Sequence, residues 1–361
     1  MKGKKIIGLC TILFTLFNFT ACETNDTKES TSGLFDTQRA LSISKDFLSN
    51  IKSGNIEGAN KLCSEELIME NVNIGEGISK ITSFDKEKSI VGSDFAYYVY
   101  NVIRTSSIAP KSDLESLTIK VEKIDDEYLI NEVKAQSKKE LFVEGDYLRI
   151  LEDQGSNSNL VVSLTSIPKD TYTSENKMML YKSEVPNDNF GTVGLSFTGK
   201  KVAISTIGQN KAYICVANIE DSLSTSAEQG ESAGQSSSSD SMSQLESLFE
   251  KPIAKKIISL DLLDGSTINN FIFSKKEDSL AVSYTNGNGV KRVSIYNANE
   301  GNMLSKNLNK EFDESQYNID EIGFNAEEFV FNVTRVSNDI GDIEKEGKYS
   351  FNIESSEIKK L

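Results

Sequence analysis

Histidine and tryptophan are both missing from this chain of 361 residues, and cysteine and proline occur only four times each. Without histidine there is no Ser-His-Asp or Cys-His machinery, no imidazole general acid and no histidine ligand for zinc or iron. Any hydrolytic activity would therefore need a carboxylate-based or metal-based centre. The sequence also has no Gly-rich phosphate loop and no Cys-x-x-Cys motif. We predict no catalytic residue and no cofactor.

Basic residues are in the minority, with 39 Lys and Arg against 54 Asp and Glu, so the net charge is −15. This acidity argues against nucleic acid as a partner, because binding to nucleic acid needs a Lys/Arg surface that displaces counterions. The segment closest to a calcium loop, residues 338–342 followed by Glu344, has the wrong ligand spacing. We interpret it as a solvated acidic turn, and no metal site is predicted.

The N-terminus has the pattern of an export signal. Lys2, Lys4 and Lys5 precede an apolar run that ends at Phe19. The run is shorter than the roughly 20 residues that a membrane-spanning helix needs, and a charged start with a short apolar core is typical of a signal peptide.

The end of this signal, Phe19-Thr20-Ala21-Cys22, resembles the lipobox of bacterial lipoproteins, although that family prefers Leu where Phe19 stands. The resemblance implies removal of residues 1–21 and lipid attachment at Cys22, so that residues 22–34 form a flexible tether. The alternative is an ordinary secretory peptide in which Cys22 is incidental.

Cleavage would remove three lysines and change the net charge from −15 to −18. Anionic lipid repels such a body, so the predicted membrane contact is the lipid itself, with each buried CH₂ contributing about 0.8 kcal/mol. We expect the protein on the extracytoplasmic face of the cell membrane. The abundance of Lys, Asn, Ile and Ser is typical of low-GC Gram-positive bacteria. Of the other cysteines, Cys63 and Cys215 are predicted to be small buried hydrophobes rather than a disulfide.

The segment that follows the tether has helix signals and then strand signals. Asp36 is suited to cap a helix that ends before Gly54, and a second short helix begins near Asn55. Strand patterns appear at 95–103 and again at 117–133, where a turn at Asp125-Asp126 indicates an antiparallel hairpin.

Residues 47–67, FLSNIKSGNIEGANKLCSEEL, are similar to the helix-Gly-Asn-helix opening of the nuclear-transport-factor-2-like superfamily. The resemblance implies an α+β domain over residues 35–140, with two helices on a curved antiparallel sheet.

Some members of that superfamily use an Asp and a Tyr for proton transfer. Here the residues would be Asp94 with Tyr97, Tyr98 or Tyr100. We favour the alternative that these tyrosines are ordinary strand residues packed under the first helix.

Residues 141–361 are dominated by strand patterns, and three segments around Phe197, Phe273 and Phe324 resemble one another. Phe273 and Phe324 are 51 residues apart. Phe197 and Phe273 are 76 apart, or 50 without the 26-residue serine-rich stretch between them, which suggests one repeated unit.

The phrase LSFTGKKVAIS at 195–205 resembles the Ser-Pro-Asp-Gly-Lys turn of TolB-like and WD-repeat-like propeller blades, through Gly199 and Lys200. This implies an all-β repeat domain, a partial or small β-propeller. An open stack of β-meanders or a paired sandwich stays an alternative. Residues 222–250 are predicted to be a disordered Ser-rich insertion that replaces a tight turn at the edge of one unit.

The sequence is compatible with two classes of function. The first is a lipid-anchored, non-enzymatic surface protein that binds or scaffolds another envelope component, a protein or a polysaccharide, through its β-repeat domain. The alternative is a solute-binding or carboxylate-dependent hydrolytic lipoprotein with a pocket in one domain. The oligomeric state is not predicted.

Overall fold

The first helices form where local capping signals place them. The computed structural model describes residues 35–70, 78–106, 108–124, 126–152, 155, 157–173, 180–219, 250–326 and 328–361. The described chain begins with α1 (Thr37–Ser53), α2 (Ile56–Asn60) and α3 (Glu65–Glu70). The Asp36 side chain accepts hydrogen bonds from the first turn of α1, and Gly54 ends that helix at φ 77°. The Asn55 side chain caps α2. Both predicted helices are confirmed.

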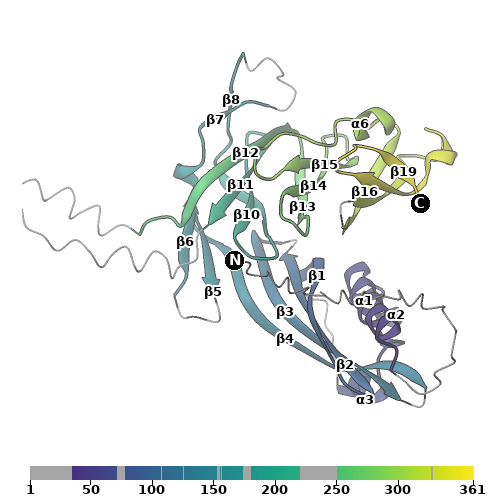
Figure 1. The fold of residues 1–361 in the computed structure, drawn as a ribbon. Coiled ribbons are helices and arrows are strands. Elements are labelled where there is room, and N and C mark those ends of the chain that lie inside the picture. Colours follow the sequence, from purple (N-terminus) through teal and green to yellow (C-terminus); the bar gives the residue numbers. More distant parts are fainter. Residues whose placement is uncertain are drawn as a thin grey trace, which may run out of the picture. The chain divides into compact units, whose positions relative to one another are not determined.

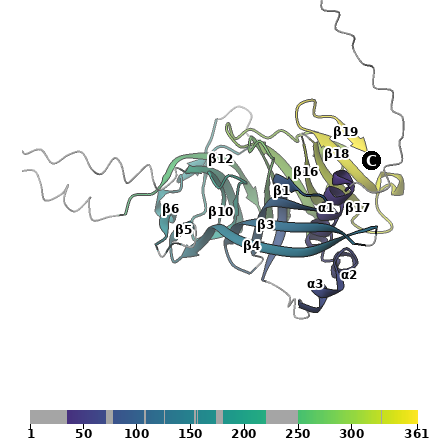
Figure 2. The same cartoon turned by 60° about the horizontal axis from the view of Figure 1, so that its bottom comes forward.

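Six antiparallel strands follow in a simple meander, each paired with the next. They are β1 (Ser79–Val91), β2 (Phe95–Ser106), β3 (Lys111–Ile124), β4 (Glu127–Glu144), β5 (Tyr147–Glu152) and β6 (Asn159–Ser163). The predicted hairpin is confirmed, since Val121 pairs with Ile130. Helix α1 packs on β1–β4 (Figure 2), where Ala40 and Leu48 share a core with strand residues such as Ile119.

The predicted fold class, an α+β domain followed by an all-β domain, is wrong. The described chain is mostly β, with 56% of its residues in strands and 13% in helices. The first sheet is not a separate two-helix module, because β4 runs on through residue 140 and pairs with β5 beyond it. Leu141 then packs in a core that includes Ile204 and Cys215 from the second half of the chain. The short helix-cap signals were read correctly, but they say nothing about how far a sheet extends.

Three further sheets come one after another along the chain (Figure 1). The first is β9 (Asn189–Leu195), β10 (Lys201–Gly208), β11 (Lys211–Ile219) and β12 (Ala254–Asp264). The next is β13 (Thr267–Phe273), β14 (Ser279–Thr285) and β15 (Lys291–Asn297). The last is β16 (Tyr317–Asn325), β17 (Glu328–Arg335), β18 (Gly347–Asn352) and β19 (Ile358–Lys360). Short elements join the sheets: η1 (Leu164–Ser166), β7 (Asp170–Thr171), β8 (Ser183–Glu184) and α6 (Leu308–Glu311). A further one, η2 (Ile343–Lys345), lies between β17 and β18 of the last sheet.

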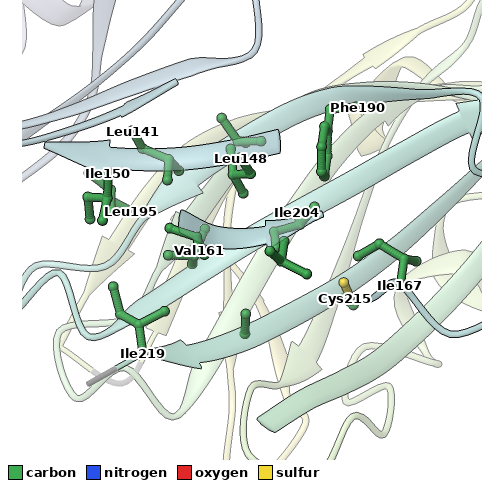
Figure 3. Close-up of a cluster of buried hydrophobic side chains, with 14 of the residues drawn as sticks. Leu141, Leu148, Ile150, Val161, Ile167, Phe190, Leu195, Ile204, Cys215 and Ile219 are labelled. Carbon is green, nitrogen blue, oxygen red and sulfur yellow. The ribbon is translucent and has the colours of Figure 1, made fainter. Parts of the chain in front are cut away.

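Strand alternation stacks these sheets face to face. Because successive residues of a strand point to opposite faces, β10 sends Val202 and Ile204 into one core and Ala203 into the next. In the same way β14 sends Leu280 toward β9–β12 and Ala281 toward β16–β19. Figure 3 shows the first of these cores, which joins β4–β6 to β9–β11. The arrangement of consecutive, stacked meander sheets is propeller-like.

The turns that begin at Ser196 and Ser274 show which residues of the first two repeated units correspond. Ser196 and Ser274 each open a turn through the same backbone hydrogen bond to the fifth residue after them. Ser196 and Ser274 are 78 residues apart, whereas Phe197 and Phe273 are 76 apart. The sequence alignment of Phe197 with Phe273 was therefore wrong by two residues, although the repeated unit is there. The Ser-rich insertion 222–250 lies outside the described residues apart from Glu250, but the strands on either side of it, β11 and β12, pair directly.

One guanidinium lies deep between the last two sheets. Arg292 on β15 is 1% exposed, and it donates hydrogen bonds to the carbonyls of Tyr317 and Phe312 and to Asn309 Oδ1, at 3.0, 2.9 and 2.6 Å. Burial lowers its pKa. These bonds tie β15 to the segment that leads into β16. No helix in the described residues has the length and apolar character to cross a membrane.

Candidate functional site

A cavity of about 660 Å³ lies beside α1, and we call it the lysine cleft. Helix α1 and strand β1 form one wall, and the ends of β13, β16 and β17 form the other. The charged lining residues are Lys45, Lys52, Asp85, Lys86, Lys275, Glu321 and Lys348. The aromatic lining residues are Phe84, Tyr100, Phe197, Phe273 and Phe324.

One polar stripe of α1 faces the cleft. Lys45, Ser49 and Lys52 all line it and are spaced i, i+4, i+7, which places them on one face of a helix. At a rise of 1.5 Å per residue, the Cα atoms of Lys45 and Lys52 are about 10 Å apart along the helix axis. The neighbouring face of α1, with Ala40, Ser44 and Leu48, is buried. The helix therefore divides its surface between the core and the cleft.

The opposite wall contains a β-bulge. The pairing of β16 with β17 shifts register between Glu321 and Gly323, so that Ile322 is the extra residue. The Ile322 carbonyl accepts a hydrogen bond of 2.6 Å from Lys52 Nζ. Gly323 has φ +137°, and a Cβ at this position would lie 3.3 Å from the same amine. Glycine is needed here for both its backbone angle and its lack of a side chain.

The environment of Lys52 weakens its proton affinity. Burial lowers the pKa of its amine from 10.5 to about 8, and the negative charge of Glu321 offsets part of this effect. The amine makes one hydrogen bond, to the Ile322 carbonyl, and within the described chain it has no carboxylate at ion-pair distance. A desolvated amine with one neutral acceptor is a position where an added negative charge is favourable.

The cleft has the opposite charge balance to the chain. Five lysines and two carboxylates line it, whereas the chain as a whole carries −15. Lys275 Nζ pairs with Asp85 Oδ1 at 3.0 Å. Among the described residues, no carboxylate lies within 4.0 Å of the amines of Lys45, Lys86 or Lys348, so these three positive charges are unneutralised within that range.

Aromatic side chains supply the apolar part of the lining. Phe84, Phe197 and Phe324 are half-buried, so each ring still exposes surface. Behind them, the buried ring of Tyr100 meets Phe84 edge-on, with ring centroids 6.0 Å apart. The cleft thus combines cations with exposed ring surface.

A second cavity, of about 380 Å³, lies where β9, β10 and the β12–β13 turn come together. Asp188 and Lys211 are its charged lining residues, and the others are mainly Gly, Ser, Thr and Asn. It is smaller, and its charges balance.

The residues suggested for proton transfer are not brought together. Tyr98 donates to the Thr37 carbonyl at 2.8 Å, and the Tyr100 hydroxyl lies 2.6 Å from Ser44 Oγ, so both tyrosines lie under α1 as the favoured interpretation had it. Burial raises the pKa of Tyr100 to about 12. Tyr97 packs against the ring of Phe95, and Asp94 is exposed.

Neither cysteine in the described chain forms a disulfide. Burial raises the pKa of Cys215 to about 12 and that of Cys63 to about 11, which makes both poor nucleophiles. The acidic turn contains Asp342, whose side chain caps η2. The part of the chain that is described holds no group of three potential metal ligands of the His, Cys, Asp or Glu type. Cys22, the predicted lipid attachment site, lies outside that part.

Sequence reasoning missed the lysine cleft. The i, i+4, i+7 spacing of Lys45, Ser49 and Lys52 is present in the sequence, but only the apolar positions of the same helix were used to predict it. The bulge at Ile322 had a weaker signal, a glycine inside a strand pattern. The meeting of Lys52 with Ile322, which are 270 residues apart, had none.

No family model and no curated protein matches the chain. Solved structures similar to it include TolB from Acinetobacter baumannii, with a TM-score of 0.27, 11% identity, and coverage of 69% of this chain and 54% of that one. Oligopeptidase B from Leishmania major has a TM-score of 0.30 at 8% identity, over 87% of this chain and 42% of that one. Oligopeptidase B from Trypanosoma brucei has a TM-score of 0.29 at 11% identity, over 90% and 51%. The chain thus spans about half the length of these proteins, and likeness at this level assigns no activity.

Proposed function

We propose that the chain is a lipid-anchored, non-enzymatic binding protein that holds its ligand in the lysine cleft. The observation that carries this proposal is the cleft itself, about 660 Å³ in volume and positive in an otherwise acidic chain. Small-molecule sites are typically concave spaces of roughly 300–1,000 Å³ that combine apolar surface with a few placed polar groups.

The two carboxylates of the cleft favour binding over carboxylate catalysis. Asp85 is paired with Lys275, and the negative charge of Glu321 acts on the amine of Lys52 without an ion pair between them. Catalysis by a pair of carboxyl groups needs both of them free to reach the reacting atoms, and one of these two is engaged in an ion pair. Residues on both sides of the cleft would contact the ligand. The meander sheets would therefore take part in binding through the ends of β13, β16 and β17, which line the cleft.

The location is proposed from the sequence. The lipobox-like end at Cys22 supports an anchor, and residues 22–34 would separate the described unit from the bilayer. The ligand would then be an envelope component or a solute outside the cell.

A cleft-filling variant tests the binding site. A library of small molecules chosen without charge bias is screened by thermal shift against the mature chain, residues 22–361, in detergent. Ser49→Trp fills the cleft from an exposed position of α1, and Thr334→Trp adds the same bulk at an exposed position elsewhere. We expect hits whose shifts disappear in Ser49→Trp and persist in Thr334→Trp. An absence of hits, or hits indifferent to Ser49→Trp, would refute the assignment.

Metabolic labelling tests the anchor. Cells expressing the chain are fed an alkyne fatty acid, and the purified protein is examined for label. We expect label on the unaltered chain and none on Cys22→Ala. Label retained by Cys22→Ala would show that the attachment site is wrong.

A further inference from the structure

We propose that the ligand of the lysine cleft is a phosphate ester whose organic part is a ring. The phosphate would lie among the lysines and the ring against the exposed faces of the phenylalanines. This inference rests on the proposed function and adds the chemical class of the ligand.

The charge of the cleft is unbalanced. Of the five lysines, Lys275 is neutralised by Asp85, while Lys45, Lys86 and Lys348 have no carboxylate within 4.0 Å in the described chain. These like charges line one cavity on three different elements, α1, β1 and β18. Without a counter-charge they repel one another, so a ligand that brings two negative charges relieves the repulsion.

The kind of cation favours phosphate over carboxylate. All five basic residues are lysines, and the described lining includes no arginine. An ammonium is a compact point charge on a flexible stem, and several of them can surround a tetrahedral dianion. A planar carboxylate is better recognised by the two-pronged guanidinium of arginine.

Lys52 is the fixed member of the set. Its amine is tied to the Ile322 carbonyl at 2.6 Å, and Gly323 leaves room for it. Lys45, Lys86 and Lys348 have no carboxylate within 4.0 Å in the described chain, so they are available to close on an anion. The bulge therefore positions one cation while the others adapt.

The phenylalanine rings of the cleft are the reason for expecting a ring in the organic part of the ligand. Phe84, Phe197 and Phe324 are half-buried and line the same cavity as the lysines. A bare inorganic anion would leave these rings in water. A sugar or aromatic ring against them gains apolar burial, at about 25 cal/mol per Å² of surface removed from water.

The test uses four simple probes on the mature chain, residues 22–361, in detergent, with affinities measured by calorimetric titration. Phenyl phosphate carries both features, inorganic phosphate only the anion, benzyl alcohol only the ring, and benzoate a ring with a planar carboxylate. We expect phenyl phosphate to bind at least ten-fold more tightly than each of the other three.

A pair of double variants separates the cleft from bulk charge. Lys45→Gln with Lys86→Gln should weaken phenyl phosphate at least ten-fold. Lys306→Gln with Lys310→Gln removes the same charge from exposed positions outside the cleft and should change its affinity less than two-fold. Equal losses in both double variants would overturn the proposal.

The other outcomes distinguish the two levels of inference. Benzyl alcohol or benzoate binding as tightly as phenyl phosphate, with loss in Ser49→Trp, would overturn the ligand class and leave the binding function intact. Inorganic phosphate binding as tightly as phenyl phosphate would overturn the role of the rings. Failure of all four probes would overturn the ligand class, and failure of the unbiased library as well would overturn the proposed function.

Discussion

Two cations of the described chain, Arg292 and the half-buried Lys52, differ in how their hydrogen-bond donors are used. Arg292, 1% exposed, donates to three oxygens of the chain. Lys52 donates to one, the Ile322 carbonyl, and beside it a cavity of about 660 Å³ opens. Within the described chain, neither has a carboxylate at ion-pair distance. Burial lowers the pKa of both groups, and in the case of Lys52 to about 8.

The difference is the one expected between a structural cation and the binding cation that we propose. The guanidinium of Arg292 has its donors used by backbone and side-chain oxygens, so the fold itself completes its environment. The amine of Lys52 uses one donor within the described chain and adjoins the cavity, so it has room for a further partner. A buried polar group that lacks partners is costly, and a ligand can supply them.

The largest expected effect is at Arg292. Arg292→Leu leaves the carbonyls of Tyr317 and Phe312 without their donor, and each unsatisfied buried carbonyl costs about 1–3 kcal/mol. We expect a loss of about 4 kcal/mol in the free energy of unfolding, measured by urea denaturation. Lys291→Leu, one residue earlier and exposed, should cost less than about 1 kcal/mol because it removes only a surface ion pair with Asp320. Equal losses in the free energy of unfolding at the two positions would show that the hydrogen bonds of Arg292 contribute no more than a surface ion pair.

The next effect is at the bulge. Gly323→Ala forces a side chain onto φ +137° and brings its Cβ to 3.3 Å from the Lys52 amine. We expect it to cost about 1–3 kcal/mol, as strained backbone positions do, and to weaken ligand binding at the same time. Gly145→Ala is the control, because Gly145 has φ +60° and open space around its Cβ position. It should lose some stability and no binding, and loss of binding there would contradict the role of the bulge.

A smaller effect is the pH dependence that Lys52 contributes. Its pKa is lowered from 10.5 to about 8 in the folded chain. Between these values the unfolded state holds a proton that the folded state has released, so stability contributed by this group rises with pH from about 8 to about 10.5. Below pH 8 both states are protonated and its slope vanishes.

Thermal unfolding at pH 7, 8, 9 and 10 measures this effect. The difference in midpoint between the unaltered chain and Lys52→Met should move in favour of the unaltered chain across that interval. Parallel profiles would show that burial does not lower the pKa of the Lys52 amine in the folded chain.

The smallest effects should come from the outer lysines. Lys45→Gln and Lys348→Gln each remove an exposed charge with no described carboxylate partner, so each should change the free energy of unfolding by less than about 0.5 kcal/mol. Urea denaturation checks this. A loss above 1 kcal/mol would mean that these lysines serve the fold, as Arg292 does, and that the contrast between the two sites is weaker than we propose.

Much of the local structure was predictable because its causes are local. Asp36, Gly54 and Asn55 act within one helical turn, and the β3–β4 hairpin follows from alternation around a short turn. The presence of a repeated strand unit in the second half was predictable, but the equivalence of Phe197 with Phe273 was not. Inward-facing residues two positions apart have the same hydrophobic pattern, and only strand pairing decides which of them correspond.

The fold class failed for a related reason. The helix signals at residues 47–67 resembled the opening of a known superfamily, but the extent of a sheet depends on what its far end packs against. Leu141 is buried against residues such as Ile204 that lie far along the chain. No local pattern contains that information.

Some properties follow from the amino-acid sequence without a structure: the N-terminal pattern around Cys22, the acidic balance, the helix ends and the presence of repeated strand units. These properties depend on composition or on neighbours a few residues apart. Tertiary structure alone decided that Lys52 meets the Ile322 carbonyl and that five lysines of an acidic chain share one cleft. Those positions lie on α1, β1, β18 and the turn after β13, and only the packing of separate sheets and a helix brings them together.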